Sequence, residues 1–180
     1  GTMNLFARSL KIPLDIWQAI DALADGDISA ADIGTADDRP FVHQFSAGLH
    51  ARMVRLRNAM TYRSRMGKIV ANTRAALGVI LDPPEFEVEF EVDGVAESRK
   101  VSAINVSNNR FGDNGLLYAD DLSGGHLGFY TTSPLKPAGV ARLAFDILRG
   151  KLRENADVRE MTGREVELHF PRVDRSINCV

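Results

Sequence analysis

Cysteine is nearly absent from this 180-residue sequence, whose single cysteine, Cys179, is the next-to-last residue. One cysteine cannot form an internal disulfide, and this fits a reducing compartment such as the cytosol. The four histidines, His43, His50, His126 and His169, lack the spacing of zinc ligands and have no cysteine partners. The composition therefore favours packed or surface histidines over a zinc site.

Long hydrophobic runs are also missing, since none approaches the roughly 18 residues that a membrane-spanning helix needs. The first residues lack the charged-then-apolar layout of a signal peptide. These absences predict a cytoplasmic location, with peripheral contact to a membrane as an alternative. The net charge is −2, which argues against a polycation built for nucleic acid, so we expect no nucleic-acid partner. The sequence is 44% hydrophobic and 26% charged, which is typical of a globular domain.

Acidic residues are missing from one long interval, because none occurs between Asp38 and Asp82. This interval carries eight basic residues, namely Arg39, Arg52, Arg55, Arg57, Arg63, Arg65, Lys68 and Arg74. One interpretation is a solvated helix face whose partners lie elsewhere in the fold. The other is a basic surface, centred on residues 52–74, that meets phosphates on a nucleotide or on an anionic membrane. The sequence does not separate the two.

Helical periodicity of apolar residues predicts three helices, over residues 13–27, 61–81 and 136–152. In the first, Pro13 suits the first turn, Asp15 suits the positive N-terminal end, and Gly26 ends the helix. The second is ended by two consecutive prolines, and the third by the pair Arg149-Gly150.

Strand signals occupy most of the remaining chain. Residues 85–92 alternate glutamate with phenylalanine or valine, which predicts a strand with one apolar and one solvent-facing acidic side. Asp93-Gly94 predicts a hairpin turn, with residues 97–108 returning as the partner strand. Further strands are predicted at 115–119, 126–132, 164–172 and 176–180, with weaker signals at 27–34 and 40–48. The predicted fold is mainly β with α, an antiparallel β-sandwich carrying two or three packed helices.

Two loops rich in glycine and asparagine, residues 107–115 and 122–128, could bring backbone N–H groups to a phosphate. Ordinary hairpin loops have the same composition. Asp120-Asp121 could bind a cation, although adjacent acids after a strand are usually part of a turn. The sequence contains no nucleophile–base constellation, P-loop lysine motif or dinucleotide fingerprint. The residues alone therefore indicate a β-rich domain without a defined reaction.

The opening stretch GTMNLFARSLKIP (1–13) resembles the motif G-T-x-N-x-F-A-R-x-L-x-I-P of the diacylglycerol kinase catalytic-domain family. This family includes bacterial lipid kinases and is related to sphingosine and NAD kinases. The similarity continues in the helix and D-x-G segment of residues 13–34 and in FVHQFSAGLHARMV (41–54), where His43 stands in place of a common asparagine. It extends through MGKIVANTRAAL (66–77) and the loop region 106–130.

The resemblance implies a two-domain enzyme of which this chain is the C-terminal β-sandwich portion. Residues 1–35 would leave the nucleotide-binding domain and include one helix, and residues 36–180 would form the β-sandwich that holds the lipid substrate. The family's Gly-Gly-Asp-Gly-Thr loop and Asp-Gly-Glu segment do not occur in these residues. We therefore expect Gly1-Thr2 to be native and the stretch to be inactive by itself. The rival expectation is a Gly-Thr scar ahead of Met3.

By the same resemblance, the intact enzyme is an ATP-dependent kinase of a diacylglycerol-like lipid, with ATP and Mg²⁺ as its cofactors. Thr2 and Asn4 would lie at the edge of the nucleotide cleft. The catalytic base belongs to the acidic segment, so no catalytic residue is assigned within 1–180. A β-sandwich that binds a lipid or another small ligand without catalysis is the alternative function. A homodimer formed through sheet edges is a further expectation.

A structural magnesium site depends, in the family, on an aspartate in the turn before the strand at 126–130. That turn lacks the acid here and reads Leu122-Ser123-Gly124-Gly125-His126-Leu127. The backbone carbonyls of Leu122 and Leu127 could still ligate a cation, with Asp121 or Asp120 in place of the missing acid.

Overall fold

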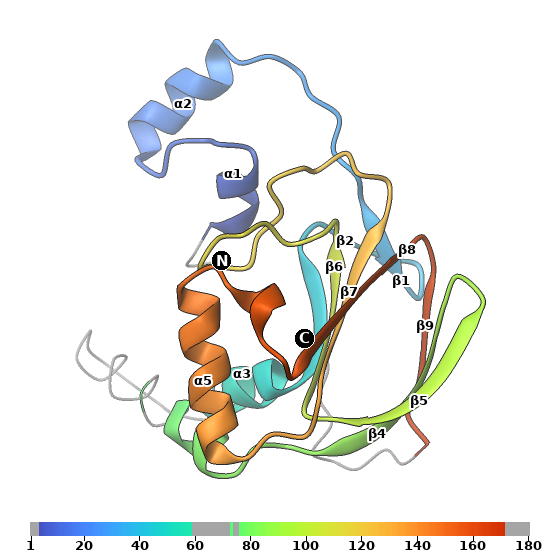
Figure 1. Cartoon of the computed structure of the whole chain (residues 1–180). Helices are drawn as coiled ribbons and strands as arrows, with labels where there is room; N and C mark the ends of the chain where they lie inside the picture. The colour runs from blue at the N-terminus through green and yellow to red at the C-terminus, as the bar shows by residue number, and fades with distance from the viewer. Residues whose placement is uncertain (1–3, 59–72, 74–75, 172–180) are drawn as a thin grey trace.

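The computed structural model describes residues 4–58, 73 and 76–171. Its centre is a β-sandwich of two antiparallel sheets, with helices against the outer face of one sheet (Figure 1). The four-stranded sheet has the order β3 (Gln44–Gly48), β6 (Ala103–Asn108), β7 (Leu127–Thr132) and β8 (Val158–Gly163). The three-stranded sheet has the order β5 (Val95–Val101), β4 (Phe86–Val92) and β9 (Val166–His169). The predicted sandwich is thus confirmed.

The sandwich core follows from the alternation in β4. Phe86, Val88, Phe90 and Val92 are buried, and the intervening glutamates are exposed, as the two-residue period predicted. The ring of Phe90 lies 4.9 Å from that of Phe129 on the opposite sheet, measured between centroids. Each such side chain contributes about 1.5–3 kcal/mol when removed from water.

The turn between β4 and β5 has positive φ at both central residues, 47° at Asp93 and 84° at Gly94. The hairpin turn predicted from the Asp-Gly pair is thus confirmed, with the geometry of type I′, and it sets the register Val92 to Val95. The carboxylate of Asp93 also accepts hydrogen bonds from the backbone N–H groups of Arg164 and Glu165, at 2.8 and 3.0 Å. One side chain therefore ties two turns together.

The strand predicted at 97–108 is wrong in one respect, because it is divided between the two sheets at Ser102. Residues up to Val101 form β5, and residues from Ala103 form β6. The buried Ser102 donates its N–H to the carbonyl of Thr132 and accepts from the N–H of Leu49, at 2.8 and 3.0 Å. These bonds satisfy the backbone at a corner where one strand changes sheets.

Helices cover the outer face of the four-stranded sheet. They are α3 (Leu49–Asn58), the helical residues 76–81 and α5 (Pro137–Leu148). A second apolar cluster joins Leu49, Val79, Val140 and Leu143 to Ala103 of the sheet. The expectation of two or three helices packed on the sandwich is therefore confirmed. The short 3₁₀ helix η1 (Leu152–Glu154) then leads the chain toward β8.

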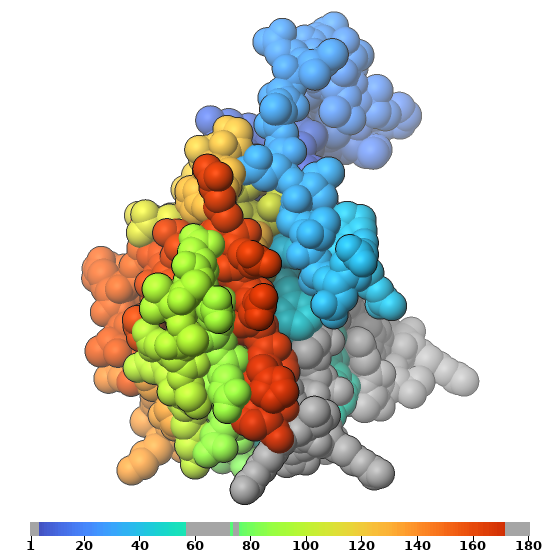
Figure 2. Space-filling view, turned by 90° about the vertical axis from the view of Figure 1, so that its right-hand side faces the viewer, coloured from blue at the N-terminus to red at the C-terminus, as the bar shows by residue number. Residues whose placement is uncertain are grey.

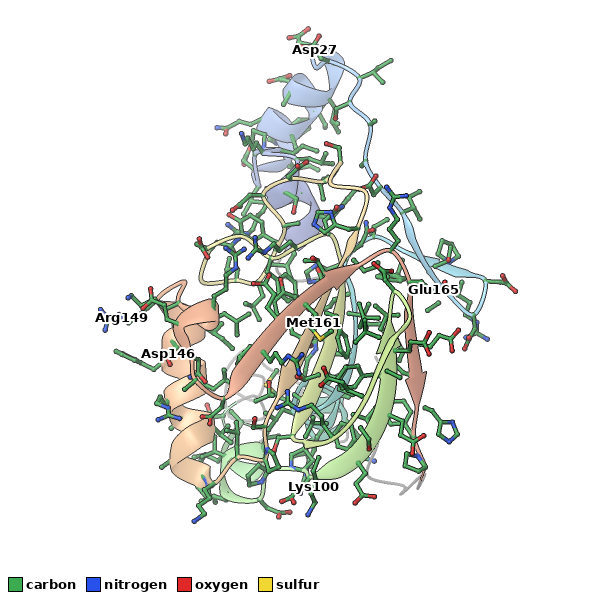
Figure 3. The ribbon with its side chains drawn as sticks, turned by 45° about the vertical axis from the view of Figure 1, so that its right-hand side comes forward. Asp27, Lys100, Asp146, Arg149, Met161 and Glu165 are labelled. Atoms are coloured by element: carbon green, nitrogen blue, oxygen red, sulfur yellow. The ribbon has the colours of Figure 1, made fainter. Side chains whose placement is uncertain are left out.

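The N-terminal residues form an arm that projects from one end of the sandwich (Figures 1 and 2). It contains α1 (Leu5–Ser9) and α2 (Ile16–Ala24). Asp15 is the N-cap of α2, with its carboxylate accepting from the N–H groups of Trp17 and Gln18. Pro13 therefore precedes the cap instead of lying in the first turn. Asp27 lies at the tip of the arm (Figure 3).

Several other sequence predictions need correction. Residues 27–33 have no regular structure, and the hairpin β1 (Gly34–Ala36) and β2 (Arg39–Phe41) follows them. Residues 115–119 form a turn with one bridge, between Phe111 and Ala119. Elements α1, α3 and β8 were not predicted. Most of the predicted helix at 61–81 and the predicted strand at 176–180 lie outside the described residues. No helix in the described part of the chain has both the length and the hydropathy needed to cross a bilayer.

Candidate functional site

The segments singled out by the sequence meet at the end of the sandwich beneath the arm. They are residues 32–35, the end of β6 with the loop that follows it, and the turn 122–126 before β7 (Figure 1). Strands β6 and β7 are antiparallel neighbours, so the end of one and the start of the other lie side by side. Sheet topology therefore brings both glycine-rich loops together.

Asp32 fastens the arm to this end of the sandwich through three hydrogen bonds of 2.7 Å. Its backbone N–H donates to the carbonyl of Leu122, and its own carbonyl accepts from Nδ2 of Asn108. Its carboxylate Oδ2 accepts from the N–H of Gly125. The sequence analysis included Asp32 in a D-x-G segment but gave it no role. In the structure, the carboxylate of Asp32 bonds to the turn 122–127, which contains no aspartate.

Asn109, the residue after β6, has an unusual combination of features. Its φ is 72°, in the left-handed region that asparagine tolerates better than most residues, and its exposed fraction is 2%. Oδ1 accepts from the N–H of Gly124 at 3.2 Å, which identifies the other side-chain atom as the NH₂ group. That Nδ2 is buried and has no hydrogen-bond partner among the described residues. An unpaired buried donor costs about 1–3 kcal/mol, so it calls for an explanation.

A network of charged side chains also holds the loop that begins at Asn109. Arg110 donates from Nε and Nη2 to the two carboxylate oxygens of Glu160, at 2.6 and 2.9 Å. The hydroxyl of Tyr130 donates to Glu160 at 3.0 Å and accepts from the N–H of Phe111 at 2.9 Å. Arg153 contributes a further contact, with Nε at 3.3 Å from Glu160. The loop is thus fixed to β7, β8 and η1.

These surroundings shift two pKa values. Burial raises the pKa of Tyr130, so its hydroxyl keeps its proton and remains a donor. Burial would also raise the pKa of Glu160, but the hydrogen bonds from Arg110 and Tyr130 outweigh it and hold that pKa below its ordinary value. Glu160 is therefore a stable carboxylate at neutral pH.

Two cavities of about 280 Å³ each flank the turn 122–126, and His126 lines both. The Asn109 cavity lies between residues 109–112 and residues 120–126, with Arg153 at its side. The Asp32 cavity lies between residues 32–35 and residues 125–127, with Asn108 and Arg164. This end of the sandwich therefore has two open clefts beside polar side chains.

The predicted nucleotide-binding residues remain untested. Thr2 lies outside the described residues. Asn4 is the exposed N-cap of α1, with a left-handed φ of 48° and no side-chain capping bond.

The predicted metal ligands do share one turn, but two of them have other partners. The Leu122 carbonyl accepts from Asp32, and Oδ1 of Asp121 accepts from both the N–H and the hydroxyl of Ser123, at 2.8 Å. Leu127 begins β7 and pairs in the sheet. Within the described ranges, no three His, Cys, Asp or Glu side chains group as metal ligands. One carboxylate and two carbonyls remain a sparse set for Mg²⁺, and the metal site stays a prediction.

A second polar cluster lies on β3 and the start of α3. Nδ1 of His50 lies 2.8 Å from the hydroxyl of the buried Ser46 and 3.2 Å from Nε2 of Gln44. Burial, together with the charge of His50, lowers the pKa of His43, so its ring is neutral at pH 7. His43 packs beside Phe111, with 6.4 Å between ring centroids. The cluster therefore borders the loop of the Asn109 cavity.

The basic interval is described only in part. Nη2 of Arg52 lies 2.5 Å from a carboxylate oxygen of Asp82, thirty residues later, which fits the interpretation of partners elsewhere in the fold. Most of residues 59–74 lie outside the described residues, so the membrane hypothesis stays a prediction.

Comparison with known proteins gave partial sequence matches and extensive structural ones. No protein-family model matches the sequence. Over 48 residues, 27% of this chain, it is 40% identical to a diacylglycerol kinase of Staphylococcus saprophyticus and 42% identical to one of Staphylococcus epidermidis. These segments cover 16% and 15% of the two relatives. The resemblance noted in the sequence is thereby confirmed for that segment.

The fold is similar to that of about half of two solved bacterial proteins. A candidate diacylglycerol kinase from Bacillus anthracis matches 94% of this chain with a TM-score of 0.65 and 18% identity. A second structure, of a diacylglycerol kinase from the same organism, matches 96% with a TM-score of 0.62 and 17% identity. The chain covers 56% and 54% of those two proteins, and so spans about half of their length.

Proposed function

We propose that this chain is the C-terminal, lipid-binding part of an ATP-dependent lipid kinase that phosphorylates the hydroxyl of a diacylglycerol-like lipid. The observation that carries the proposal is the match of 94% of the chain to a candidate diacylglycerol kinase of known structure. The 48-residue similarity to staphylococcal diacylglycerol kinases supports it independently. The 180 residues alone are expected to be inactive.

Phosphoryl transfer requires positioning and charge stabilisation more than covalent catalysis by the protein. ATP would supply the phosphoryl group, and Mg²⁺ would neutralise charge on its phosphates. The role of this chain would be to hold the lipid acceptor and to fix its own loops near the nucleotide. Asp32 serves the second task, because two of its bonds join the arm to the turn 122–126 and the third joins it to Asn108 at the end of β6. Asn4, at the start of the arm, would face the nucleotide cleft.

The apolar side of α2 supports the assignment of residues 1–35 to a boundary between domains. Trp17 is 73% exposed, and Ile16 and Leu23 are 65% and 66% exposed. A helix that presents large apolar side chains to water indicates a surface that another part of a protein covers. A nucleotide-binding domain, as in the two-domain kinases, fits that position.

Membrane docking through residues 52–74 is part of the proposal, since the lipid acceptor resides in a bilayer. Each well-placed cation near an anionic leaflet contributes about 1 kcal/mol. We therefore propose that the enzyme works at the cytoplasmic side of a membrane, as a peripheral protein. A homodimer formed through sheet edges remains a separate proposal.

The direct test is an assay of the full reading frame with radiolabelled ATP, Mg²⁺ and diacylglycerol in mixed micelles. Formation of phosphatidic acid is expected from the full protein and not from residues 1–180. A full protein that neither consumes ATP nor labels any of diacylglycerol, sphingosine or a polyprenol would refute the kinase.

A non-catalytic lipid-binding module is the second candidate function. It is favoured by two departures from the family pattern, namely His43 in place of an asparagine and the lack of an aspartate in the turn 122–127. The two functions differ in one measurement on the full protein. Retention of diacylglycerol in a vesicle-binding experiment without phosphorylation would identify the module.

A further inference from the structure

Helix α5 presents apolar side chains to water on the side that faces away from the sandwich. Its inner side packs on the sheet through the buried Val140 and Leu143. On the outer side, Phe145 is 56% exposed and Leu148 is 73% exposed. Intervals of three and four residues place these two on one stripe with the exposed alanines at 138 and 141. A helix that is apolar on both sides normally has both sides covered, so this stripe, the outer face of α5, lacks a cover among the described residues.

Basic residues border the outer face of α5. The guanidinium carbon of Arg149 lies 5.2 Å from the ring centre of Phe145, and Arg149 lies at the outer edge of the molecule (Figure 3). Lys136, just before the helix, has no ion pair within the described ranges, whereas Arg142 pairs with the residue before β8. Residues 136–151 contain five charged residues, of which four are basic. The fifth, Asp146, is half-buried and accepts a hydrogen bond of 2.6 Å from a neighbouring asparagine.

The opposite side of the sandwich carries the opposite charge. Glu87, Glu89 and Glu91 of β4 are exposed on the outer face of the three-stranded sheet. Glu167 of β9 is exposed beside them, paired in register with Glu91. Two packed sheets are about 10 Å apart, which exceeds the Debye length of about 8 Å at physiological salt. A negatively charged surface against α5 is therefore attracted by the nearby cations, while the glutamates across the sandwich are largely screened from it.

Helix α2 shows that exposed apolar residues alone do not define the kind of partner. Trp17 and Leu23 are exposed to a similar degree, but residues 14–28 contain four aspartates and no basic residue. An anionic surface would repel that helix, which fits the protein domain inferred above as its cover. Helix α5 combines exposed phenylalanine and leucine with flanking lysine and arginine. This combination is typical of helices that lie in the interface of an anionic bilayer.

We propose that the outer face of α5 docks on an anionic lipid bilayer, with Phe145 and Leu148 in the interface and with Lys136 and Arg149 at the lipid phosphates. Helix α3 and residues 76–81 cover the same face of the four-stranded sheet, so the helical layer is turned toward the lipid and the three-stranded sheet away from it (Figure 1). The use of this orientation to meet a lipid acceptor rests on the proposed function, whereas the docking itself does not.

Docking is tested by sedimentation of the chain with two kinds of vesicle, phosphatidylcholine alone and an equal mixture of phosphatidylcholine with phosphatidylglycerol. Binding to the anionic vesicles is expected to be about tenfold tighter or more and to weaken with salt, since each well-placed cation contributes about fivefold. The double variant Phe145→Ala/Leu148→Ala is expected to lose about tenfold of that binding. Trp17→Ala/Leu23→Ala removes a matched pair from α2 and should lose none. Equal binding to both kinds of vesicle, or equal losses in the two variants, overturns the proposal.

Tryptophan fluorescence locates the contact. Trp17 is the single tryptophan of the chain and lies on α2, so the parent protein is its own control. In a Trp17→Phe background, the substitution Phe145→Trp places the fluorophore on α5. Anionic vesicles are expected to shift the emission of this variant to shorter wavelength, and brominated lipids to quench it, while Trp17 of the parent responds to neither. A response of Trp17 alone overturns the assignment to α5.

Charge reversal separates local docking from net charge. Arg149→Glu is expected to weaken binding to anionic vesicles about 25-fold, because two unit charges are changed at about fivefold each. Arg164→Glu makes the same change in the turn between β8 and β9, next to Glu165 on the far side of the molecule, and should cost less than about threefold (Figure 3). Equal losses would indicate a response to net charge and overturn the docking through α5.

Three further outcomes are decisive. Full binding by both α5 variants would leave the contact to residues 52–74 and overturn the proposal. Loss of self-association by Phe145→Ala/Leu148→Ala, measured by light scattering, with vesicle binding unchanged, would assign the face to a second copy and overturn it as well. Kinase activity is measured separately on the full reading frame. A protein that docks through α5 without phosphorylating a lipid would refute the proposed function and leave the docking standing.

Discussion

The carboxylate of Asp32 accepts a hydrogen bond of 2.7 Å from the backbone N–H of Gly125, 93 residues later in the chain. Asp32 belongs to a stretch without regular structure, and Gly125 belongs to a tight turn with a left-handed φ of 66°. The bond joins the projecting arm to the turn between the two cavities. The carboxylate is one of three groups of Asp32 that hold the arm to the sandwich, and this gives the first prediction.

Replacing Asp32 by alanine removes the carboxylate and leaves the two backbone bonds of residue 32 in place. We expect a loss of about 1 kcal/mol in the free energy of unfolding, or about 2–4 °C in Tm, because the bond is partly solvent-exposed. The control is Asp27→Ala at the tip of the arm, for which no change is expected (Figure 3). Thermal unfolding checks both, and equal Tm values for the two variants would contradict the prediction.

Glu160→Gln should remove part of the pH dependence of stability. Since the folded-state pKa of Glu160 is below its ordinary 4.5, the stability it contributes is present above pH 4.5 and is lost as the pH falls through the folded value. We expect the variant to be less stable by about 1–2 kcal/mol at pH 7, and the gap to shrink toward pH 3. Urea unfolding from pH 7 to pH 3 measures the gap. Glu167→Gln is the exposed control, and a gap that stays constant with pH would refute this account.

Two glycine substitutions should change the free energy of unfolding differently, with Gly94→Ala lowering it and Gly139→Ala raising it or leaving it unchanged. Gly94→Ala places a side chain at a φ of 84° in the type I′ turn, where strain of about 1–2 kcal/mol is expected although no atom lies near the new Cβ. Gly139→Ala lies in α5, where alanine is favoured by up to about 1 kcal/mol and the added Cβ would meet only the flexible end of Leu135 at 3.1 Å. Chemical unfolding should rank Gly139→Ala above the parent or equal to it, and Gly94→Ala below it. The reverse order would contradict the turn assignment.

Phe129→Ala should be among the most damaging single substitutions. Phe129 is fully buried between the sheets, and its ring packs on Phe90. Truncation should cost about 3–5 kcal/mol, a large part of the roughly 5–15 kcal/mol that stabilises a typical domain. Phe145→Ala, on the outer side of α5 and 56% exposed, should change stability by less than about 0.5 kcal/mol. Similar losses for the two variants would show that the core is placed wrongly.

Much of the sandwich could be predicted from local patterns. The apolar residues that alternate along residues 86–92 are buried in the core, as expected. Met161 packs against the same core (Figure 3), although its strand β8 was not predicted. Strand β8 was not predicted because Val158–Gly163 has one charged residue on each side, Arg159 on the side of Met161 and Glu160 on the other, so no apolar side stands out in the sequence. The division of one predicted strand at Ser102 could not be predicted locally, because the hydrogen bonds that hold this corner come from Thr132 and Leu49, both distant in the chain.

The sequence by itself determined what depends on neighbours in the chain. Phenylalanine and valine at every second position dictate a half-buried strand, Asp93-Gly94 permits two successive positive φ angles, and Asp15 caps a helix with its own side chain. These effects act over two to four residues, so no knowledge of the fold is needed to foresee them.

Only the tertiary structure decided the site. The bond from Gly125 to Asp32, the pairing of Arg110 with Glu160, and the bond from Gly124 to Asn109 each depend on which segments the sheets bring together. A side chain's partner and its distance from water are properties of packing, because the groups that meet are tens of residues apart in the chain.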